Sequence, residues 1–347
     1  MGVAQRWVRV VIAGVLLVMV GCTQESTSSP TDEPAPSTER STEPSPSPTT
    51  PASPDPTQDA TEPPAEEPPA DGPPAERAAF DRDRAMKVVR FLAGEIGPRE
   101  GSSAAFRRAA HYVGRRFTAL GYDVARQPVP VPAGNSWGID VPAGTSYNVI
   151  ADPEGFEPRE PHIIVGAHLD TVPQAPGAED NASGVGSVLE LARLASLEQP
   201  EVPVRFIAFG AEEPRGEGDA LHHFGSQLYV REMGRAQQQV LVAMVSLDRV
   251  GIRGPDVPLC SAPGGATDTR DAVARTARQL DIEVDLCDDN TTSDHWSFTK
   301  AGLPSARFGS IPYDGYHSAG DVPSVIDETQ IQRVGRIMWR WLSTRRS

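Results

Sequence analysis

Short apolar segments alternate with helical patterns along most of this sequence, and this alternation limits the possible folds more than any other feature. Residues 162–167 and 204–209 are apolar along almost their whole length, as expected for strands that are buried on both faces. Buried strands that alternate with helices indicate a mostly parallel sheet with helices packed on both of its faces. We therefore predict a three-layer α/β fold, with a mostly parallel mixed central sheet and helices on both faces.

The same periodicity predicts the remaining elements. In one helical segment Phe106, Ala110, Val113 and Phe117 repeat at the spacing of a single helix face. Further strands are expected at 147–150, 240–247 and 305–308. Helices are expected at 82–96, 103–119, 182–196, 227–234, 268–280 and 327–345. No internal repeat interrupts this order, so residues 77–347 should form one domain.

The chain before this domain has a different composition. Two arginines and an apolar run precede Cys22, which resembles a bacterial lipoprotein signal peptide over residues 1–21. Residues 22–76 are rich in Pro, Ser, Thr and Glu, and such a segment should be a disordered tether. We expect export and anchoring to the outer face of the cell membrane through acylated Cys22, with partial release left open. An ordinary secretory signal is the alternative, and it also implies export.

The formal net charge of −15 is unevenly distributed. Residues 23–76 contain twelve acidic side chains and one basic side chain, so most of the negative charge lies in the tether. The rest of the chain has no stripe of Lys or Arg residues. Because nucleic-acid binding needs such a basic surface, we expect no nucleic-acid partner.

Two cysteines remain once Cys22 is assigned to the signal. Cys260 and Cys287 form an even pair in a chain that is expected to enter an oxidising compartment. We therefore predict a disulfide bond between them. Two buried free thiols are the alternative, because a sequence does not show whether two cysteines are close in space.

Acidic residues and histidines follow the expected strands at the points where the strands end. In open α/β sheets, ligands collect at the carboxyl ends of the strands, so one cleft could gather these side chains. Their carboxylate oxygens and imidazole nitrogens are suitable zinc ligands. Taken singly, each residue has an ordinary structural explanation, such as a helix cap for Asp180. The residues are His168, Asp170, Asp180, Glu212, Glu213, Asp248 and His317.

In order and spacing these residues resemble the co-catalytic zinc aminopeptidases, a family that also contains glutamate carboxypeptidase-like enzymes and glutaminyl cyclases. The resemblance covers about residues 85–345. The segments that carry it are His168-Leu169-Asp170, Asp180-Asn181-Ala182-Ser183-Gly184, Glu212-Glu213, Asp248, Ser293-Asp294-His295-Trp296-Ser297-Phe298 and His317.

The resemblance implies two Zn²⁺ ions per chain. His168 and Asp248 would bind one ion, Glu213 and His317 would bind the other, and Asp180 would bridge them. Two such cations can share a water molecule, lower its pKa and polarise the scissile carbonyl. Residues 77–347 would then be the catalytic domain of a metallo-aminopeptidase that acts on peptides, and we expect it to be monomeric.

The resemblance also implies three catalytic side chains. Glu212 would be the general base that takes a proton from the water and passes it to the leaving amine. Asp170 would be the partner of His168, since a metal-binding His commonly has a carboxylate partner. Tyr316 matches a tyrosine that hydrogen-bonds the developing oxyanion in many members.

Two departures from the family pattern stand out. An insertion, Pro214–Phe224, separates the Glu pair from Gly225-Ser226. It should lie beside the cleft and could shape substrate selection, and we expect its His222 and His223 to be surface or packing residues. Arg249 also occupies a position where an apolar residue is more usual.

Three other functions remain open. A glutaminyl cyclase would keep a similar scaffold and similar ligands but would work with a single zinc. A carboxypeptidase for acidic C-terminal residues would need basic residues in the pocket, for which Arg215, Arg249, Arg253 and Arg307 are available. A catalytically inactive tethered binding lipoprotein is the non-enzymatic possibility, and Glu212 together with the full ligand set speaks against it.

Overall fold

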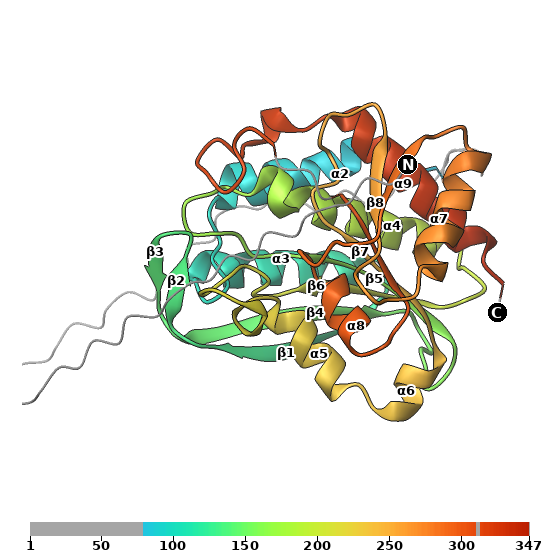
Figure 1. Cartoon of the computed structure of the whole chain (residues 1–347), viewed down its shortest axis with the longest axis horizontal. Helices are drawn as coiled ribbons and strands as arrows, with labels where there is room; N and C mark the ends of the chain where they lie inside the picture. Colours follow the sequence, from blue (N-terminus) through green and yellow to red (C-terminus); the bar gives the residue numbers. More distant parts are fainter. Residues whose placement is uncertain (1–78, 310–312, 347) are drawn as a thin grey trace, which may run out of the picture. The chain divides into compact units, whose positions relative to one another are not determined.

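The computed structural model describes residues 79–309 and 313–346 (Figure 1), which fall within the unit Glu67–Ser347. The expected signal peptide, Cys22 and the tether over 22–76 lie outside the described residues. Of the helices in the described ranges, none has both the length and the apolar character needed to cross a bilayer.

One eight-stranded sheet organises these residues, in the order β1-β4-β6-β5-β7-β10-β8-β9. Its strands are β1 (Asp123–Val131), β4 (Gly144–Asp152), β5 (His162–His168), β6 (Val204–Phe209), β7 (Leu241–Leu247), β8 (Val257–Cys260), β9 (Val284–Cys287) and β10 (Ser305–Phe308). The central strands β6, β5, β7 and β10 are parallel to one another. The pairs β1–β4, β4–β6 and β10–β8 are antiparallel, and β8 pairs parallel with β9. The predicted mixed sheet with a parallel centre is therefore confirmed. A separate hairpin pairs β2 (Gly134–Ser136) with β3 (Ile139–Val141).

Helices cover both faces of this sheet (Figure 1). One layer contains α2 (Arg82–Val89), α3 (Ala104–Ala119), α4 (Ser183–Leu197), α7 (Asp268–Gln279) and α9 (Glu328–Thr344). The opposite layer contains α5 (Phe224–Glu232) and α8 (His295–Lys300). A short helix, α6 (Arg235–Val240), follows α5 in the chain. The shorter helical segments are η1 (Arg90–Ile96), η2 (Ala178–Ala182), η3 (Asp219–Leu221) and η4 (Pro323–Val325).

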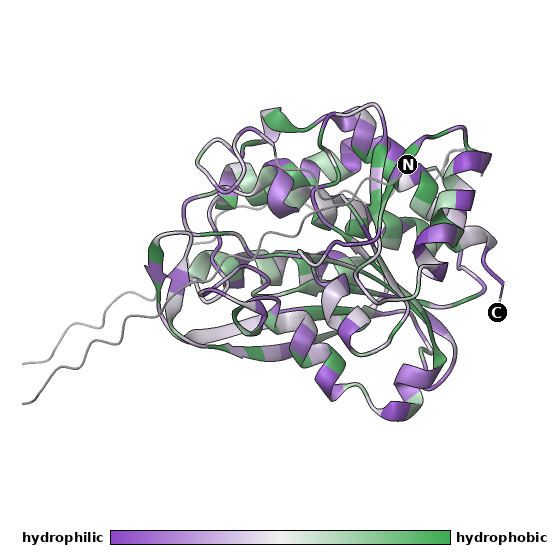
Figure 2. Cartoon of the chain, viewed as in Figure 1, coloured by the Kyte–Doolittle hydropathy of each residue, from purple (hydrophilic) through white to green (hydrophobic). Residues whose placement is uncertain are grey.

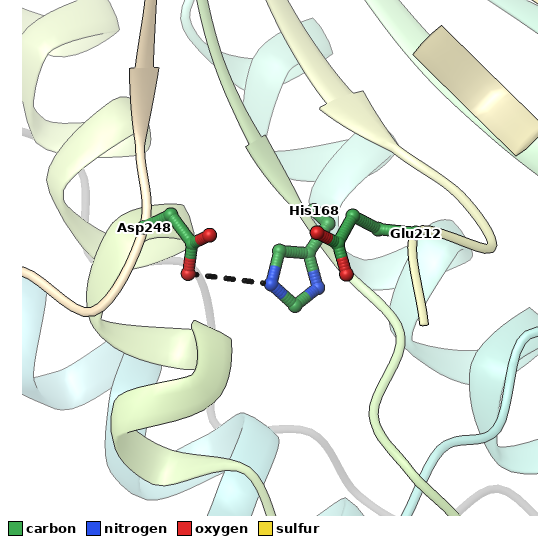
Figure 3. Close-up of side chains that lie close together, drawn as sticks. All are labelled: His168, Glu212 and Asp248. Carbon is green, nitrogen blue, oxygen red and sulfur yellow. Dashed lines mark ion pairs between the residues drawn. The ribbon is translucent and has the colours of Figure 1, made fainter. Parts of the chain in front are cut away.

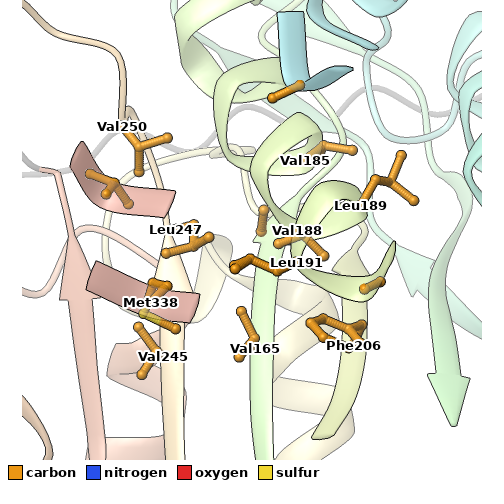
Figure 4. Packing of buried hydrophobic residues seen from close by; sticks show 14 of the residues in the cluster. Val165, Val185, Val188, Leu189, Leu191, Phe206, Val245, Leu247, Val250 and Met338 are labelled. Carbon is orange, nitrogen blue, oxygen red and sulfur yellow. The ribbon is translucent and has the colours of Figure 1, made fainter. Parts of the chain in front are cut away.

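Alternate residues of the central strands enter two different cores. In β5, Ile163 and Val165 pack into the large core beneath α4, whereas Ile164 packs into the smaller core with Phe209 and Phe298. Figure 4 shows Val165 among the side chains that α4 and the neighbouring strands contribute to the large core. Each fully buried side chain of this size contributes about 1.5–3 kcal/mol. Burial on both faces explains why these strands are mostly apolar. Figure 2 shows the surface helix α6, by contrast, as largely hydrophilic.

The predicted elements are present with small changes of boundary. The expected helix at 227–234 corresponds to α5, which begins at Phe224. The backbone N–H of Phe224 donates to the carbonyl of Ala211, which fixes the last residue of the insertion where the helix begins. Val240 ends α6 instead of starting the strand expected at 240–247. The edge strands β1 and β9 and the short helix α8 were not among the predicted elements.

The structure contains the predicted disulfide bond between Cys260 and Cys287. The two residues are register partners in the parallel pair β8 and β9. The bond therefore joins the last strand of the sheet to its neighbour and closes a loop with a sequence separation of 27 residues, which contains α7.

Replacing both cysteines by alanine should lower the free energy of unfolding by about 3 kcal/mol, because the cross-link restricts the unfolded chain. Urea denaturation with and without a reductant measures this effect. The reductant should destabilise the native chain by a similar amount and leave the double variant unchanged. Equal stability of the native chain in both conditions would show that the bond does not contribute.

Candidate metal centre

Three parallel strands deliver polar side chains to one edge of the sheet. His168, the last residue of β5, pairs in register with Phe209, the last residue of β6, and β7 ends beside them at Leu247. Asp248 follows β7 directly, and Glu212 lies three residues after the end of β6. Figure 3 shows the imidazole of His168 between the carboxylates of Asp248 and Glu212. The distance from His168 Nε2 to Asp248 Oδ1 is 3.5 Å.

The Asp180 carboxylate lies between two histidines. Its Oδ1 is 3.0 Å from His168 Nε2, and its Oδ2 is 3.1 Å from His317 Nε2. His317 Nε2 is in turn 3.5 Å from Glu213 Oε2. The five residues with expected ligand roles therefore meet in space, with Asp180 at the centre, although they come from five separate segments of the chain.

The donor atoms of this cluster fit a bound cation. Asp248 Oδ1 and Glu213 Oε1 are buried and accept no hydrogen bond from any described residue. Buried anionic atoms without donors are costly unless a cation compensates them. Two overlapping groups have ligand atoms within 4.8 Å of one another, and mixed imidazole and carboxylate donors of this kind suit zinc. These groups are His168 with Glu212 and Asp248, and His168 with Asp180 and Glu213.

The pKa values of the cluster reflect crowded negative charge in a buried site. Burial raises the pKa of Glu213 well above its usual value, and the carboxylates of Asp180 and Glu212 raise it further. For Asp180 burial acts in the same direction, but hydrogen bonds from His168 and His317 hold its pKa well below the usual range. Hydrogen-bond donation from the two imidazoles therefore stabilises the charged form of Asp180.

Asp170 supports the cluster through its carboxylate. Its two oxygens accept hydrogen bonds from the backbone N–H groups of Glu212, at 3.0 Å, and Glu213, at 3.1 Å. His168 Nδ1 lies 3.2 Å from the backbone carbonyl of Asp170 and 3.9 Å from its carboxylate. The expected partner of His168 thus contacts the imidazole mainly through its backbone, and its side chain positions the Glu pair.

Two charged residues outside the expected ligand and catalytic sets complete this support. Arg307 is fully buried in β10, and its Nη2 lies 2.9 Å from Asp248 Oδ2. Asp321 accepts hydrogen bonds from the backbone N–H groups of Glu179, at 2.8 Å, and Asp180, at 3.1 Å. A signal existed for Arg307, because it and Arg205 are the charged residues within the expected strands. No such pattern marks Asp321.

Tyr316 and Arg249 lie beside the cluster. The ring of Tyr316 stacks on His317 with 3.7 Å between ring centroids, and the Arg249 guanidinium lies 4.8 Å from the centroid of the Tyr316 ring. Arg249 Nε is also 3.8 Å from Asp248 Oδ1. The unusual arginine thus occupies a site between an anionic ligand residue and an aromatic ring, which suits a planar cation.

A pocket of about 540 Å³ opens onto the cluster. The insertion forms one wall through Pro214, Asp219, His222 and His223. This confirms that the insertion lies beside the cleft, as expected. His223, however, is buried with its imidazole against Glu212, a contact that the prediction of a surface or packing residue did not include. The other lining residues are Trp137, Asp180, Glu212, Glu213, Gly218, Asp248, Arg249, Thr291, Thr292, Trp296, Tyr316 and His317.

Comparison with known proteins places this arrangement in a family. Residues 148–342 match the model described as Peptidase family M28. Aminopeptidase YwaD of Bacillus subtilis is 29% identical over 204 residues, which are 56% of this chain and 43% of that protein. The chain spans less than half the length of the first curated relatives that it matches.

Solved structures share the fold. BSAP, a zinc aminopeptidase from Bacillus subtilis, aligns with a TM-score of 0.67 at 19% identity, over 76% of this chain and 94% of that chain. The glutaminyl cyclase of Porphyromonas gingivalis aligns with a TM-score of 0.65 at 25% identity, over 76% of this chain and 98% of that chain. With the family model covering more than half of the sequence and the expected strand-end residues gathered at one pocket, the chain belongs to peptidase family M28.

Proposed function

We propose that this protein is a zinc-dependent exopeptidase that removes residues from the free N-terminus of peptides. One observation carries the proposal. The Asp180 carboxylate lies between His168 and His317, with one oxygen close to each imidazole. A carboxylate in this position is suited to bridge two metal ions, and Asp248 and Glu213 stand on opposite sides of it as further anionic ligands.

The residues divide into two ligand sets. His168 and Asp248 would hold one zinc ion, Glu213 and His317 would hold the other, and Asp180 would contribute to both. The donor-free oxygens of Asp248 and Glu213 support this division. When bound, the two ions supply Lewis-acid chemistry, which lowers the pKa of a water molecule and polarises a carbonyl group.

Glu212 is the side chain that moves the proton. It lines the pocket beside the ligand residues. Burial alone would raise its pKa, but the imidazoles of His168 and His223 hold the pKa below the usual value, so the carboxylate is ionised at neutral pH. It can therefore accept a proton from water and deliver it to the leaving amine.

Tyr316 supplies a hydrogen-bond donor in the pocket that Glu212 also lines. Burial raises the pKa of its phenol, and the nearby charge of Asp180 raises it further, so the hydroxyl stays protonated. A protonated hydroxyl can donate to the carbonyl oxygen of the scissile bond as negative charge develops there.

The charge of the pocket favours a free N-terminus over a C-terminal carboxylate. Four acidic ligand or base residues line the pocket, and Asp219 of the insertion adds another carboxylate. Bound zinc ions would balance the ligand carboxylates, so Glu212 and Asp219 are the acidic groups left to attract a peptide N-terminus, which carries a positive charge over much of the neutral pH range. Arg249 lies in the same wall but is placed against Asp248 and Tyr316.

A mono-zinc glutaminyl cyclase is the second candidate. The structural similarity to the Porphyromonas gingivalis enzyme favours it, as does the position of Glu212 within ligand distance of His168 and Asp248. The number of zinc ions separates the two functions, because the cyclase reaction is expected to use one ion and the peptidase reaction two.

We also propose that the protein is exported and attached to the cell membrane through acylated Cys22. The apolar run before Gly21-Cys22 supports this, as does the tether-like composition of 22–76. Labelling of producing cells with a radioactive fatty acid should mark the protein, and a Cys22→Ala variant should remain unlabelled.

Purified protein should release the first residue from aminoacyl anilides and from peptides with a free N-terminus. Acetylation of the N-terminus should abolish cleavage, because the acidic pocket then loses its cationic group. Chelation should stop the reaction, zinc should restore it, and metal analysis should find two zinc ions per chain. Cyclisation of glutaminyl peptides with one zinc per chain would identify a cyclase, and absence of any turnover would favour a binding protein.

The two adjacent glutamates should respond differently to the same substitution. Glu212→Gln should lower turnover by roughly 10²–10⁴, the usual scale for a general base, and keep both zinc ions. Glu213→Gln should lose one zinc, because a neutral amide replaces an anionic ligand. Glu217→Gln, exposed in the insertion, is the matched control and should change neither property. Loss of zinc from Glu212→Gln alone would reverse the two roles.

The support of Asp180 by Asp321 should be visible in metal affinity. Asp321→Asn keeps the size of the side chain but can accept only one of the two backbone hydrogen bonds to Glu179 and Asp180. Loss of such a supporting contact typically lowers metal affinity by about 10–100-fold. Competition with a chelator measures zinc affinity, with the exposed Asp83→Asn as control. Unchanged affinity would mean that the Asp180 segment holds its position without Asp321.

A further inference from the structure

His223 is a buried residue of the insertion to which the proposed reaction assigns no part. Its side chain is 4% exposed, and its Nε2 lies 3.2 Å from Oε1 of Glu212. Its other ring nitrogen has no hydrogen-bond partner among the described residues. The polar contact of this imidazole is therefore directed at the carboxylate that the proposed reaction uses as its base.

The backbone around His223 holds this contact in place. His223 has φ 53° and ψ 35°, a left-handed conformation that is uncommon for residues other than glycine. Its backbone N–H donates to the carbonyl of Glu212 at 2.8 Å, and the next residue, Phe224, donates to the carbonyl of Ala211 at 2.9 Å. The chain thus returns from the insertion directly against the segment that carries the base.

The insertion itself is anchored on both limbs. The Arg215 guanidinium donates to the carbonyls of Pro132, at 2.7 Å, and Pro142, at 2.6 Å, and pairs with Glu100. On the other limb, Asp219 accepts a hydrogen bond from Trp296 Nε1 at 2.9 Å and pairs with a lysine of α8. A loop held to two different parts of the domain can place a side chain accurately, which a freely moving loop cannot.

Charge favours the same contact. Burial by itself would lower the pKa of His223, but the Glu212 carboxylate raises it above its usual value, and Asp294 and Asp219 add to this. An imidazole can carry a proton on Nε2 in either its charged form or one neutral tautomer. His223 can therefore donate a hydrogen bond to Glu212 in both forms.

We propose that His223 is a positioning residue for the general base: its Nε2–H donates to Oε1 of Glu212 and leaves the second carboxylate oxygen to accept the proton from water. The contact restricts the rotation of a flexible side chain, so the base is oriented before substrate binds. This inference rests on the proposed role of Glu212 in catalysis. It gives the insertion a part in the reaction itself besides forming a wall of the pocket.

Three substitutions in the full-length protein test the contact. His223→Leu removes the donor with little change in volume, and His223→Asn removes it with a polar side chain that is too short to reach Glu212. His223→Gln keeps an N–H group near the position of Nε2. We expect kcat to fall about 10–100-fold in the Leu and Asn variants, with KM changed by less than about threefold, and to recover substantially in the Gln variant. His111→Gln, at an exposed histidine of α3, is the control.

Readouts other than turnover separate positioning from damage to the site. Zinc content and the thermal unfolding temperature, measured with and without zinc, should stay near those of the native protein in all variants. In a Glu212→Gln background, His223→Leu should cause no further loss of kcat, because the group that it orients is already inactive. Loss of zinc, equal losses in the Gln and Leu variants, or a full additional loss in the Glu212→Gln background would overturn the proposal.

The same experiments distinguish the two levels of inference. If Glu212→Gln itself retains full turnover, the proposed function of Glu212 is wrong. If Glu212→Gln loses turnover while His223→Leu and His223→Asn both retain it, the base stands and only the positioning role of His223 fails.

Discussion

Concentration of negative charge in a buried position is the constraint on which the rest of this site depends. Bringing a carboxylate out of water costs several kcal/mol even after the protein relaxes, and like charges that lie together cost more. Here several such groups meet at one edge of the sheet. The contacts of His168 and His317 with Asp180 and the guanidinium of the fully buried Arg307 stabilise part of this charge, and zinc ions would offset the rest. The acidic residues in the cluster are Asp170, Asp180, Glu212, Glu213 and Asp248.

The scaffold holds these charges through backbone contacts as much as through side chains. Asp170 and Asp321 each accept two backbone N–H groups from segments that carry ligand residues. At Gly184 an added Cβ would lie 2.1 Å from the carbonyl oxygen of Leu247, so the start of α4 can approach the end of β7 only with glycine there. The hydrogen bonds to Asp170 and Asp321 and the close approach at Gly184 fix the path of the loops. The path of each loop then determines where its proposed ligand side chain lies.

The sequence predicted the central strands and the ligand cluster well because both depend on local patterns. A strand buried on both faces, such as β5, is apolar along its centre from Ile163 to Ala167, and residues after parallel strands necessarily meet at one edge. The edge strand β1 is mostly exposed and contains two prolines, so it lacked that pattern. Arg307 contacts Asp248, and Asp321 contacts the Asp180 segment. Both contacts join residues far apart in the chain, so no local sequence pattern predicts them.

The insertion shows how a departure from a family pattern can become part of the shared machinery. A long surface segment normally gains little from being ordered, because fixing each residue costs about 1–2 kcal/mol of backbone entropy. Arg215 and Asp219 offset that cost by tying the two limbs to separate parts of the domain. Once fixed, the segment places His223 against Glu212 while its outer residues line the pocket. The shape of one pocket wall and the contact with Glu212 then depend on the same loop, so under the proposed roles a substitution there would affect both substrate binding and the orientation of the base.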